Sequence, residues 1–173
     1  MNATEKIRSA MIRTVKGLTK RPELAKVHRS VRAKLTDGLT CEIEAEDFRF
    51  VADMPEIAGG NAAGASPSCL LEAALASCLA IGFRMICAER EIPLDQVEVE
   101  VAGSFDVRGL YGMDGVSPGF EGPLVYTVHV QSPASEAELA AALKTVEAQS
   151  PLLNILTKPP VLQRELRHNS AAE

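Results

Sequence analysis

Tryptophan is absent from this 173-residue sequence, and aromatic residues make up only 4% of it. Metal-binding patterns are also absent, because the four cysteines include no C-x-x-C pair and the three histidines include no H-x-x-x-H spacing. We therefore expect neither a structural zinc site nor a cofactor. The residues concerned are Cys41, Cys69, Cys78, Cys87, His28, His129 and His168.

The N-terminal segment shows no apolar run followed by a small-residue cleavage site, which a secretory leader would have. We expect a cytoplasmic protein whose cysteines are free thiols in a reducing environment. Hydrophobic residues make up 46% of the chain, which is enough for one domain with a full core.

Charge is distributed unevenly along the chain. Residues 1–40 have a net charge of +7 and residues 41–173 a net charge of −12, within the total of −5. The basic segment has no aromatic residue for base stacking, and its charges are scattered. We expect it to be a solvated helix or a contact between subunits, and we expect no nucleic-acid partner and no membrane partner.

The apolar periodicity predicts an α+β domain. Residues 4–18 show helical spacing, and residues 27–52 alternate as a three-stranded antiparallel meander with a turn at Asp37-Gly38. Ser66 and Pro67 predict the start of a helix that runs to about Glu91. The remaining predicted elements are strands at 97–101 and 120–131, a helix from the Ser135 and Glu138 capping box to Glu147, a helical turn at Pro151, and a last strand at 159–166.

The predicted helix after Ser66 is apolar on every side from Cys69 to Phe83, apart from Glu72 and Ser77. Such a helix is buried either in protein or in lipid. A membrane span needs about 20 apolar residues, and Glu72 and Arg84 leave too few between them. We therefore expect protein to enclose this helix, and we expect an obligate dimer.

Three cysteines lie nine residues apart on this helix. Nine residues turn a helix by about 900°, so Cys69 and Cys87 share a face and Cys78 lies opposite. Neighbouring cysteines are separated by about 13 Å along the axis, beyond the limit of about 7 Å for a disulfide. Cys78 is the candidate reactive thiol because Gly82, one turn away, allows a ligand to approach closely, although helix packing through a small residue explains Gly82 equally well.

Arg29 is the second candidate site residue. In a strand beginning at Val27 it would lie on the apolar face, where a guanidinium needs a thiolate or carboxylate partner. The alternative is that its side chain extends to solvent from the strand end.

From about Val27 onward the sequence resembles the osmotically inducible protein C and organic hydroperoxide resistance (OsmC/Ohr) superfamily. The resemblance rests on "SP" before the apolar helix, "ASC" within it, and "SPLLN" where the family has a Cys-Pro pair. Two positions differ from the family pattern, because Ser68 replaces a glutamate and Ser150 replaces the resolving cysteine.

This resemblance implies an α+β fold with antiparallel sheets around a long central helix, in an intertwined homodimer whose active site lies at the subunit interface. It also implies one domain over residues 26–173, with residues 1–25 as an N-terminal helical extension. Cys78 would attack the hydroperoxide, and Arg29 would lower the pKa of its thiol.

Two functions are compatible with these features. The first is reduction of organic hydroperoxides in the oxidative stress response, with Cys78 as nucleophile, Arg29 as activator and an external thiol as reductant. The second is a dimer without catalytic activity that binds a small apolar ligand at the subunit interface, where Cys78 only lines the site.

Overall fold

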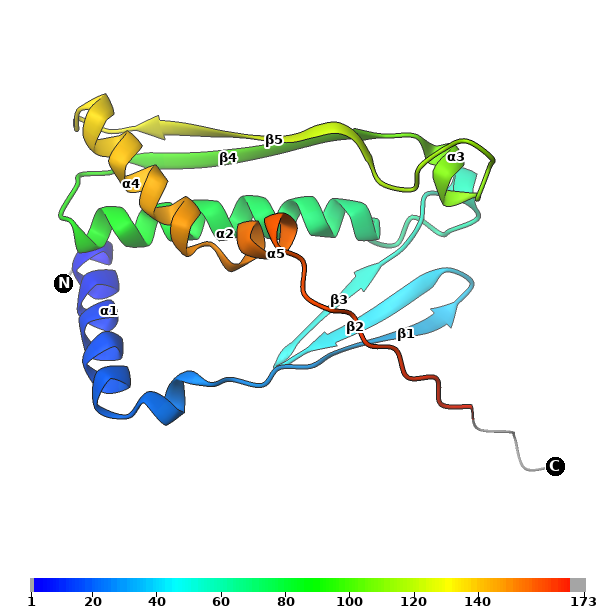
Figure 1. Ribbon diagram of the computed structural model, residues 1–173, viewed down its shortest axis with the longest axis horizontal. Helices are drawn as coiled ribbons and strands as arrows, with labels where there is room; N and C mark the ends of the chain where they lie inside the picture. The colour runs from blue at the N-terminus through cyan, green and yellow to red at the C-terminus, as the bar shows by residue number, and fades with distance from the viewer. Residues whose placement is uncertain (1, 169–173) are drawn as a thin grey trace.

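The computed structural model describes residues 2–168 and is organised around one long helix, α2 (Figure 1). Two antiparallel sheets and four other helices accompany it. In chain order the elements are α1 (Ala3–Lys20), the 3-10 helix η1 (Pro22–Ala25), β1 (Val31–Asp37), β2 (Thr40–Ala45), β3 (Phe48–Ala52), the 3-10 helix η2 (Glu56–Ala58), α2 (Pro67–Glu89), β4 (Gln96–Phe105), α3 (Val107–Leu110), β5 (Phe120–Gln131), α4 (Glu136–Gln149) and α5 (Pro151–Thr157).

Local signals in the sequence determine where the main helices begin. Ser66 caps α2 by accepting the backbone N–H of Cys69, and Pro67 occupies the first turn, as predicted. Ser135 and Glu138 form the predicted capping box of α4. Helix α1 covers the predicted 4–18 and is also opened by a capping box, between Asn2 and Glu5.

The strands form two separate sheets. β1, β2 and β3 make the predicted meander, and Gly38 adopts the positive φ of +54° that its tight turn requires. β4 and β5 pair in a second sheet, which lies along one side of α2 (Figure 1). The predicted start of the first strand was wrong, because β1 begins at Val31 rather than Val27.

The predicted last strand is also absent. Residues 159–166 are an extended segment that pairs with neither sheet, and Leu162 within it is 92% exposed. A strand exists only where a neighbouring strand accepts its backbone hydrogen bonds, and a single copy of the chain offers this segment none. The alternation of apolar and polar residues at 159–166 was therefore not sufficient to form a strand.

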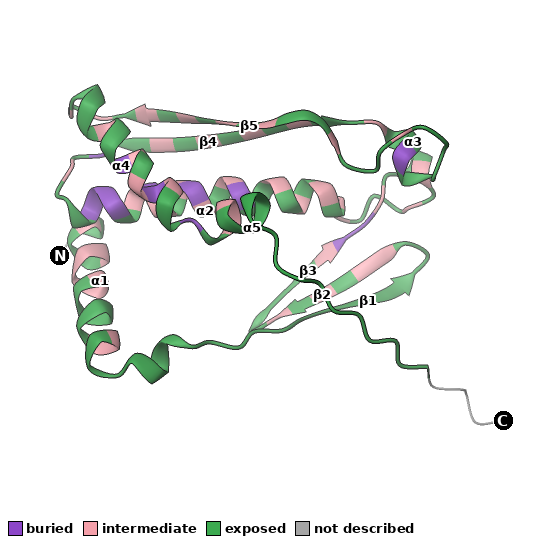
Figure 2. Cartoon of the chain, viewed as in Figure 1, coloured by how far each residue is buried: buried purple, intermediate pink, exposed green. Residues whose placement is uncertain are grey.

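The buried residues of α2 lie between Leu75 and Ala88, and its N-terminal turns contribute none (Figure 2). Leu75, Leu79 and Phe83 are buried against the β4–β5 sheet and α4, whereas Ile81 on another face is 60% exposed. The expectation that protein encloses the helix therefore holds for one face within a single chain. By length and composition α2 could also cross a membrane, a test that buried core helices pass as well.

Asp53 organises the loop that leads from β3 into α2. Its side chain is 2% exposed, and its carboxylate accepts hydrogen bonds from Thr40 Oγ1 at 2.8 Å and from the backbone N–H groups of Met54, Asn61 and Ala63 at 2.7–3.2 Å. Burial alone would raise the pKa of Asp53, but these hydrogen bonds together hold it below its ordinary value.

The same loop requires two glycines. A Cβ at Gly60 would lie 2.0 Å from the carbonyl oxygen of Met54, and one at Gly64 would lie 2.2 Å from that of Val51. Both distances are closer than side-chain carbons tolerate. The glycine-rich composition thus reflects close packing of the loop on β3.

We expect the Asp53→Asn variant to unfold several degrees below the wild type at pH 7, because an amide NH₂ would replace an oxygen that accepts hydrogen bonds. A carboxyl whose folded pKa is depressed stabilises the fold above its unfolded pKa of about 4, and this contribution disappears as the pH falls through the folded pKa. Thermal unfolding should therefore show a difference between variant and wild type that shrinks in acid. Asp47→Asn, in the exposed β2–β3 turn, is the control; equal melting temperatures for Asp53→Asn and wild type at pH 7 would contradict this role.

Candidate active site

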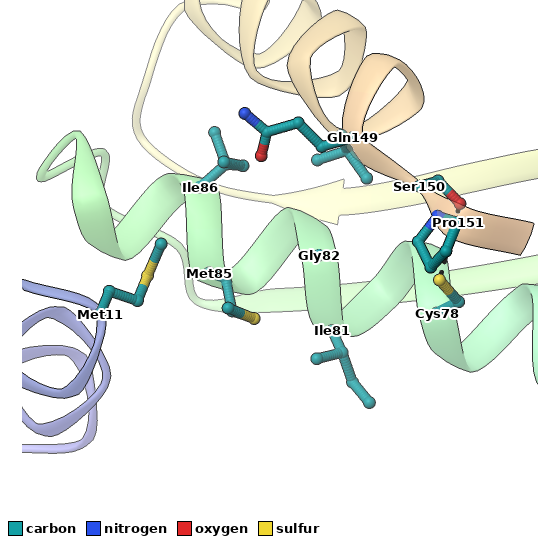
Figure 3. Close-up of a pocket in the computed structure, with 10 residues that line it drawn as sticks. Met11, Cys78, Ile81, Gly82, Met85, Ile86, Gln149, Ser150 and Pro151 are labelled. Atoms are coloured by element: carbon teal, nitrogen blue, oxygen red, sulfur yellow. Dashed lines mark hydrogen bonds between the residues drawn. The ribbon is translucent and has the colours of Figure 1, made fainter. Parts of the chain in front are cut away.

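Cys78 lies in a largely apolar cavity of about 430 Å³ beside α2 (Figure 3). The cavity follows one stripe of the helix, from Cys78 past Gly82 to Met85. Residues of α1 and α4 and the start of α5 complete the wall. The lining residues are Met11, Cys78, Ile81, Gly82, Met85, Ile86, Val146, Gln149, Ser150 and Pro151.

The polar partner of Cys78 is Ser150. The Sγ atom of Cys78 lies 3.6 Å from Ser150 Oγ, within hydrogen-bond range for sulfur. Ser150 is 4% exposed and caps α5, where its Oγ accepts the backbone N–H of Leu153 at 3.2 Å. This cap holds the hydroxyl beside the half-buried thiol.

Gly82 lies beneath α4. A Cβ at this position would lie 3.0 Å from Val146 Cγ1, so the glycine allows α4 to pack closely on α2. Gly82 also lines the cavity next to Cys78. Both interpretations of Gly82 from the sequence, close helix packing and open space beside the thiol, therefore apply.

The other three cysteines have different surroundings. Cys87 is 1% exposed in the core, and burial raises the pKa of its thiol despite the nearby Arg84 and Arg90. Cys69 shares the face of Cys87 but is exposed, because the core does not extend to the N-terminal turns of α2. Cys41 is half-buried on β2, and all four cysteines are free thiols. Cys87 is therefore a core residue.

The structure does not bring Arg29 and Cys78 together within one chain. Arg29 precedes β1, its side chain is 72% exposed, and its Nε lies 3.0 Å from Glu46 Oε1. It lines a separate polar hollow on the surface with His28 and Arg32. The expectation of an inward guanidinium failed because the strand begins two residues after Arg29.

Ser68, at the position of the family's glutamate, also lies outside the cavity. It is in the first turn of α2, where its Oγ lies 3.1 Å from that of Ser66. Among the residues that line the cavity, none has a charged side chain. The site in a single copy therefore consists of a thiol, a hydroxyl, the Gln149 amide and apolar walls.

Met11 is a lining residue that the sequence did not indicate. Met11 lies at the far end of the cavity from Cys78 and comes from α1, which stands roughly perpendicular to α2 (Figures 1 and 3). Arg8 Nη1 bonds Glu91 Oε1 at 2.5 Å, and Arg84 bonds Thr4 Oγ1 at 3.0 Å, which fixes α1 against α2. The apolar stripe of α1 was visible in the sequence, but the element it would contact was not.

Comparisons with known proteins agree with this fold. The model of the OsmC-like protein family matches residues 59–165. An OsmC-like protein from Mycoplasma pneumoniae has 21% identity and a TM-score of 0.60, covering 77% of this chain and 89% of its own. An organic hydroperoxide resistance protein from Legionella pneumophila has 19% identity and a TM-score of 0.55, covering 77% and 91%. Another from Elizabethkingia anophelis has 17% identity and a TM-score of 0.53, covering 77% and 90%. No curated protein matches this sequence.

Proposed function

Because this chain belongs to the OsmC-like protein family, we propose that it reduces organic hydroperoxides, with Cys78 as the attacking thiol. The observation that carries the proposal is the position of Cys78, half-buried at an apolar cavity with a hydroxyl 3.6 Å from its sulfur. An apolar cavity suits the organic part of such a substrate. Family relatives named for organic hydroperoxide resistance share the fold.

The remaining cysteines are weaker candidates. Cys87 is enclosed in the core, and its raised pKa disfavours the thiolate that reacts. Cys69 is exposed, and Cys41 on β2 is half-buried. Neither of them borders any of the described cavities. Cys78 combines access with a polar partner.

The proposed reaction is a two-electron transfer. The Cys78 thiolate attacks the terminal oxygen of R–O–OH, an S–O bond forms, and the O–O bond breaks. The leaving alkoxide takes up a proton and departs as R–OH, so the peroxide is reduced and Cys78 is oxidised to a sulfenic acid. An external thiol then attacks the sulfenic sulfur and releases water, and a second thiol displaces Cys78 from the mixed disulfide.

The reductant comes from outside the chain in this proposal. The hydroxyl of Ser150 occupies the position beside Cys78 where a second thiol could resolve the sulfenic acid, and a hydroxyl cannot form a disulfide. A cytoplasmic location would supply reduced small thiols. In this proposal residues 26–173 form the catalytic domain and residues 1–25 are its extension.

We further propose a homodimer in which the partner subunit supplies Arg29 to the Cys78 site. The uncovered face of α2 and the apolar face of the first sheet present more apolar surface than a monomer usually leaves in water. A guanidinium near Cys78 would stabilise its thiolate. The apolar residues concerned include Val31, Leu35, Phe48, Leu71, Ile81 and Met85.

The test is peptide mapping after one equivalent of an organic hydroperoxide such as cumene hydroperoxide, with a sulfenic-acid trap present. We expect the trap on Cys78, complete loss of that product in Cys78→Ser, and no loss in Cys69→Ser, which alters an exposed thiol on the same helix. Arg29→Gln should slow trapping about tenfold or more, since one pKa unit corresponds to a tenfold change in thiolate. Arg32→Gln, at a second arginine that lines the same surface hollow, should not slow trapping.

Two other outcomes of the peptide mapping would contradict the proposed mechanism. A Cys41–Cys78 disulfide would identify a relocated resolving thiol and exclude the one-cysteine mechanism. Survival of all four thiols would refute catalysis, and the dimer that binds an apolar ligand would replace it.

A further inference from the structure

Ser150 has a hydrogen available for Cys78. Its Oγ accepts the backbone N–H of Leu153 at 3.2 Å, so one lone pair of the oxygen is engaged by the α5 cap. The hydroxyl proton has no other acceptor among the described residues, and Cys78 Sγ lies 3.6 Å away. The cap thus holds the oxygen while leaving its proton free to point at sulfur.

The direction of this hydrogen bond depends on the state of the thiol. When Cys78 is protonated, either group can donate. When Cys78 ionises, the thiolate carries no proton, so the only possible bond runs from the Ser150 hydroxyl to the sulfur. The bond to the thiolate is charge-assisted and therefore stronger than the bond between the two neutral groups, so it favours the ionised form.

We infer that Ser150 is a positioning residue whose hydroxyl donates a hydrogen bond to the Cys78 thiolate and so stabilises the form of the nucleophile that reacts. The inference rests on the proposed function, in which the Cys78 thiolate attacks the hydroperoxide. Ser150 thereby helps to activate the Cys78 thiol. It does so from the position that a resolving cysteine would otherwise occupy.

The apolar surroundings of Cys78 increase the effect of the Ser150 hydroxyl on the thiolate. Within the described chain, α1 contributes Met11, α2 contributes apolar residues and Gly82, and α4 contributes Val146 and Gln149 to the cavity wall. None of these groups titrates, and none is charged. In a largely apolar site each available donor has a larger effect on an anion than it would in water.

The experiment measures the ionisation of Cys78 itself in the full-length protein. The rate of iodoacetamide alkylation is followed against pH by mass spectrometry of the peptide that contains Cys78, so the other thiols remain in place. We expect Ser150→Gly to raise the pKa of Cys78 by about one unit, with an alkylation rate about tenfold lower at pH values below both pKa values. Glycine is nearly as good as serine at a helix N-cap, so the α5 cap should be largely retained.

Three further variants separate the hydrogen bond from a structural effect. Ser150→Ala, the second variant without a hydroxyl, should give the same rise, and Ser150→Thr should keep the wild-type pKa. Ser135→Gly removes the corresponding capping hydroxyl of α4 and should leave Cys78 unchanged. An unchanged pKa in the glycine and alanine variants would overturn the inference, as would an equal rise in the threonine variant.

Failure of this inference can be told apart from failure of the proposed function. Alkylation reports the ionisation of Cys78 without any peroxide. If wild-type Cys78 forms no sulfenic acid with a hydroperoxide, the proposed function is wrong whatever the pH profile. If it forms one but its pKa ignores Ser150, only the role of the hydroxyl is wrong.

Discussion

The Ser150→Cys variant should form a disulfide with Cys78 when it meets one equivalent of an organic hydroperoxide. The Sγ of Cys78 and the Oγ of Ser150 are 3.6 Å apart, so a small side-chain rotation would bring a thiol at position 150 to bonding distance. A sulfenic acid condenses with a neighbouring thiol and releases water. Because that thiol would be part of the same molecule, the condensation should outcompete an external trap.

Non-reducing peptide mapping measures this change directly. The trapped sulfenic acid at Cys78 should fall by on the order of tenfold or more, and a peptide that links positions 78 and 150 should replace it. Ser77→Cys is the matched control, because Ser77 lies next to Cys78 on α2 but its exposed hydroxyl bonds the Ala74 carbonyl of its own helix. Undiminished trapping in Ser150→Cys would show that the two positions do not approach each other in the working protein.

The second large effect is expected at the uncovered face of α2. We expect the wild type to sediment as a dimer at micromolar concentration and Ile81→Glu to weaken association on the order of a hundredfold or more. In a twofold-symmetric dimer each substitution occurs twice, so two carboxylates would lose water at the interface. Ile81 is 60% exposed within one chain, so a dimer that covers this face would bury it. A charge at this position should therefore have a large effect on association.

Analytical ultracentrifugation over a concentration series gives the dissociation constant of each variant. Lys144→Glu also introduces a carboxylate, on an exposed position of α4, and should leave association unchanged. A folded wild-type monomer at micromolar concentration would exclude the dimer, and with it the supply of Arg29 by a partner subunit.

Features specified by neighbouring residues could be predicted from the sequence. The starts of α2 and α4 follow from Ser66-Pro67 and from Ser135 with Glu138, because a helix cap is satisfied within about four residues. The turn at Gly38 is equally local. Cys78 was singled out because Gly82 lies one helical turn away, and both residues border the cavity. The period of a helix determines which residues share a stripe, so this pairing could be read from the sequence.

Features that depend on distant partners could not be predicted in the same way. The strand expected at 159–166 has no neighbour to pair with in one chain, and the position of Arg29 shifted outward because β1 starts at Val31. Met11 joins the site only through the packing of α1 on α2. Asp53 gave no signal, because its partners at positions 40, 61 and 63 converge only after folding.

The network around Asp53 also has a mechanical consequence. Its hydrogen bonds tie β2, the end of β3 and the loop before α2 to one carboxylate, so bending this loop would require breaking several of them despite its glycines. A displacement of the first sheet would therefore be passed on to the residues that lead into α2.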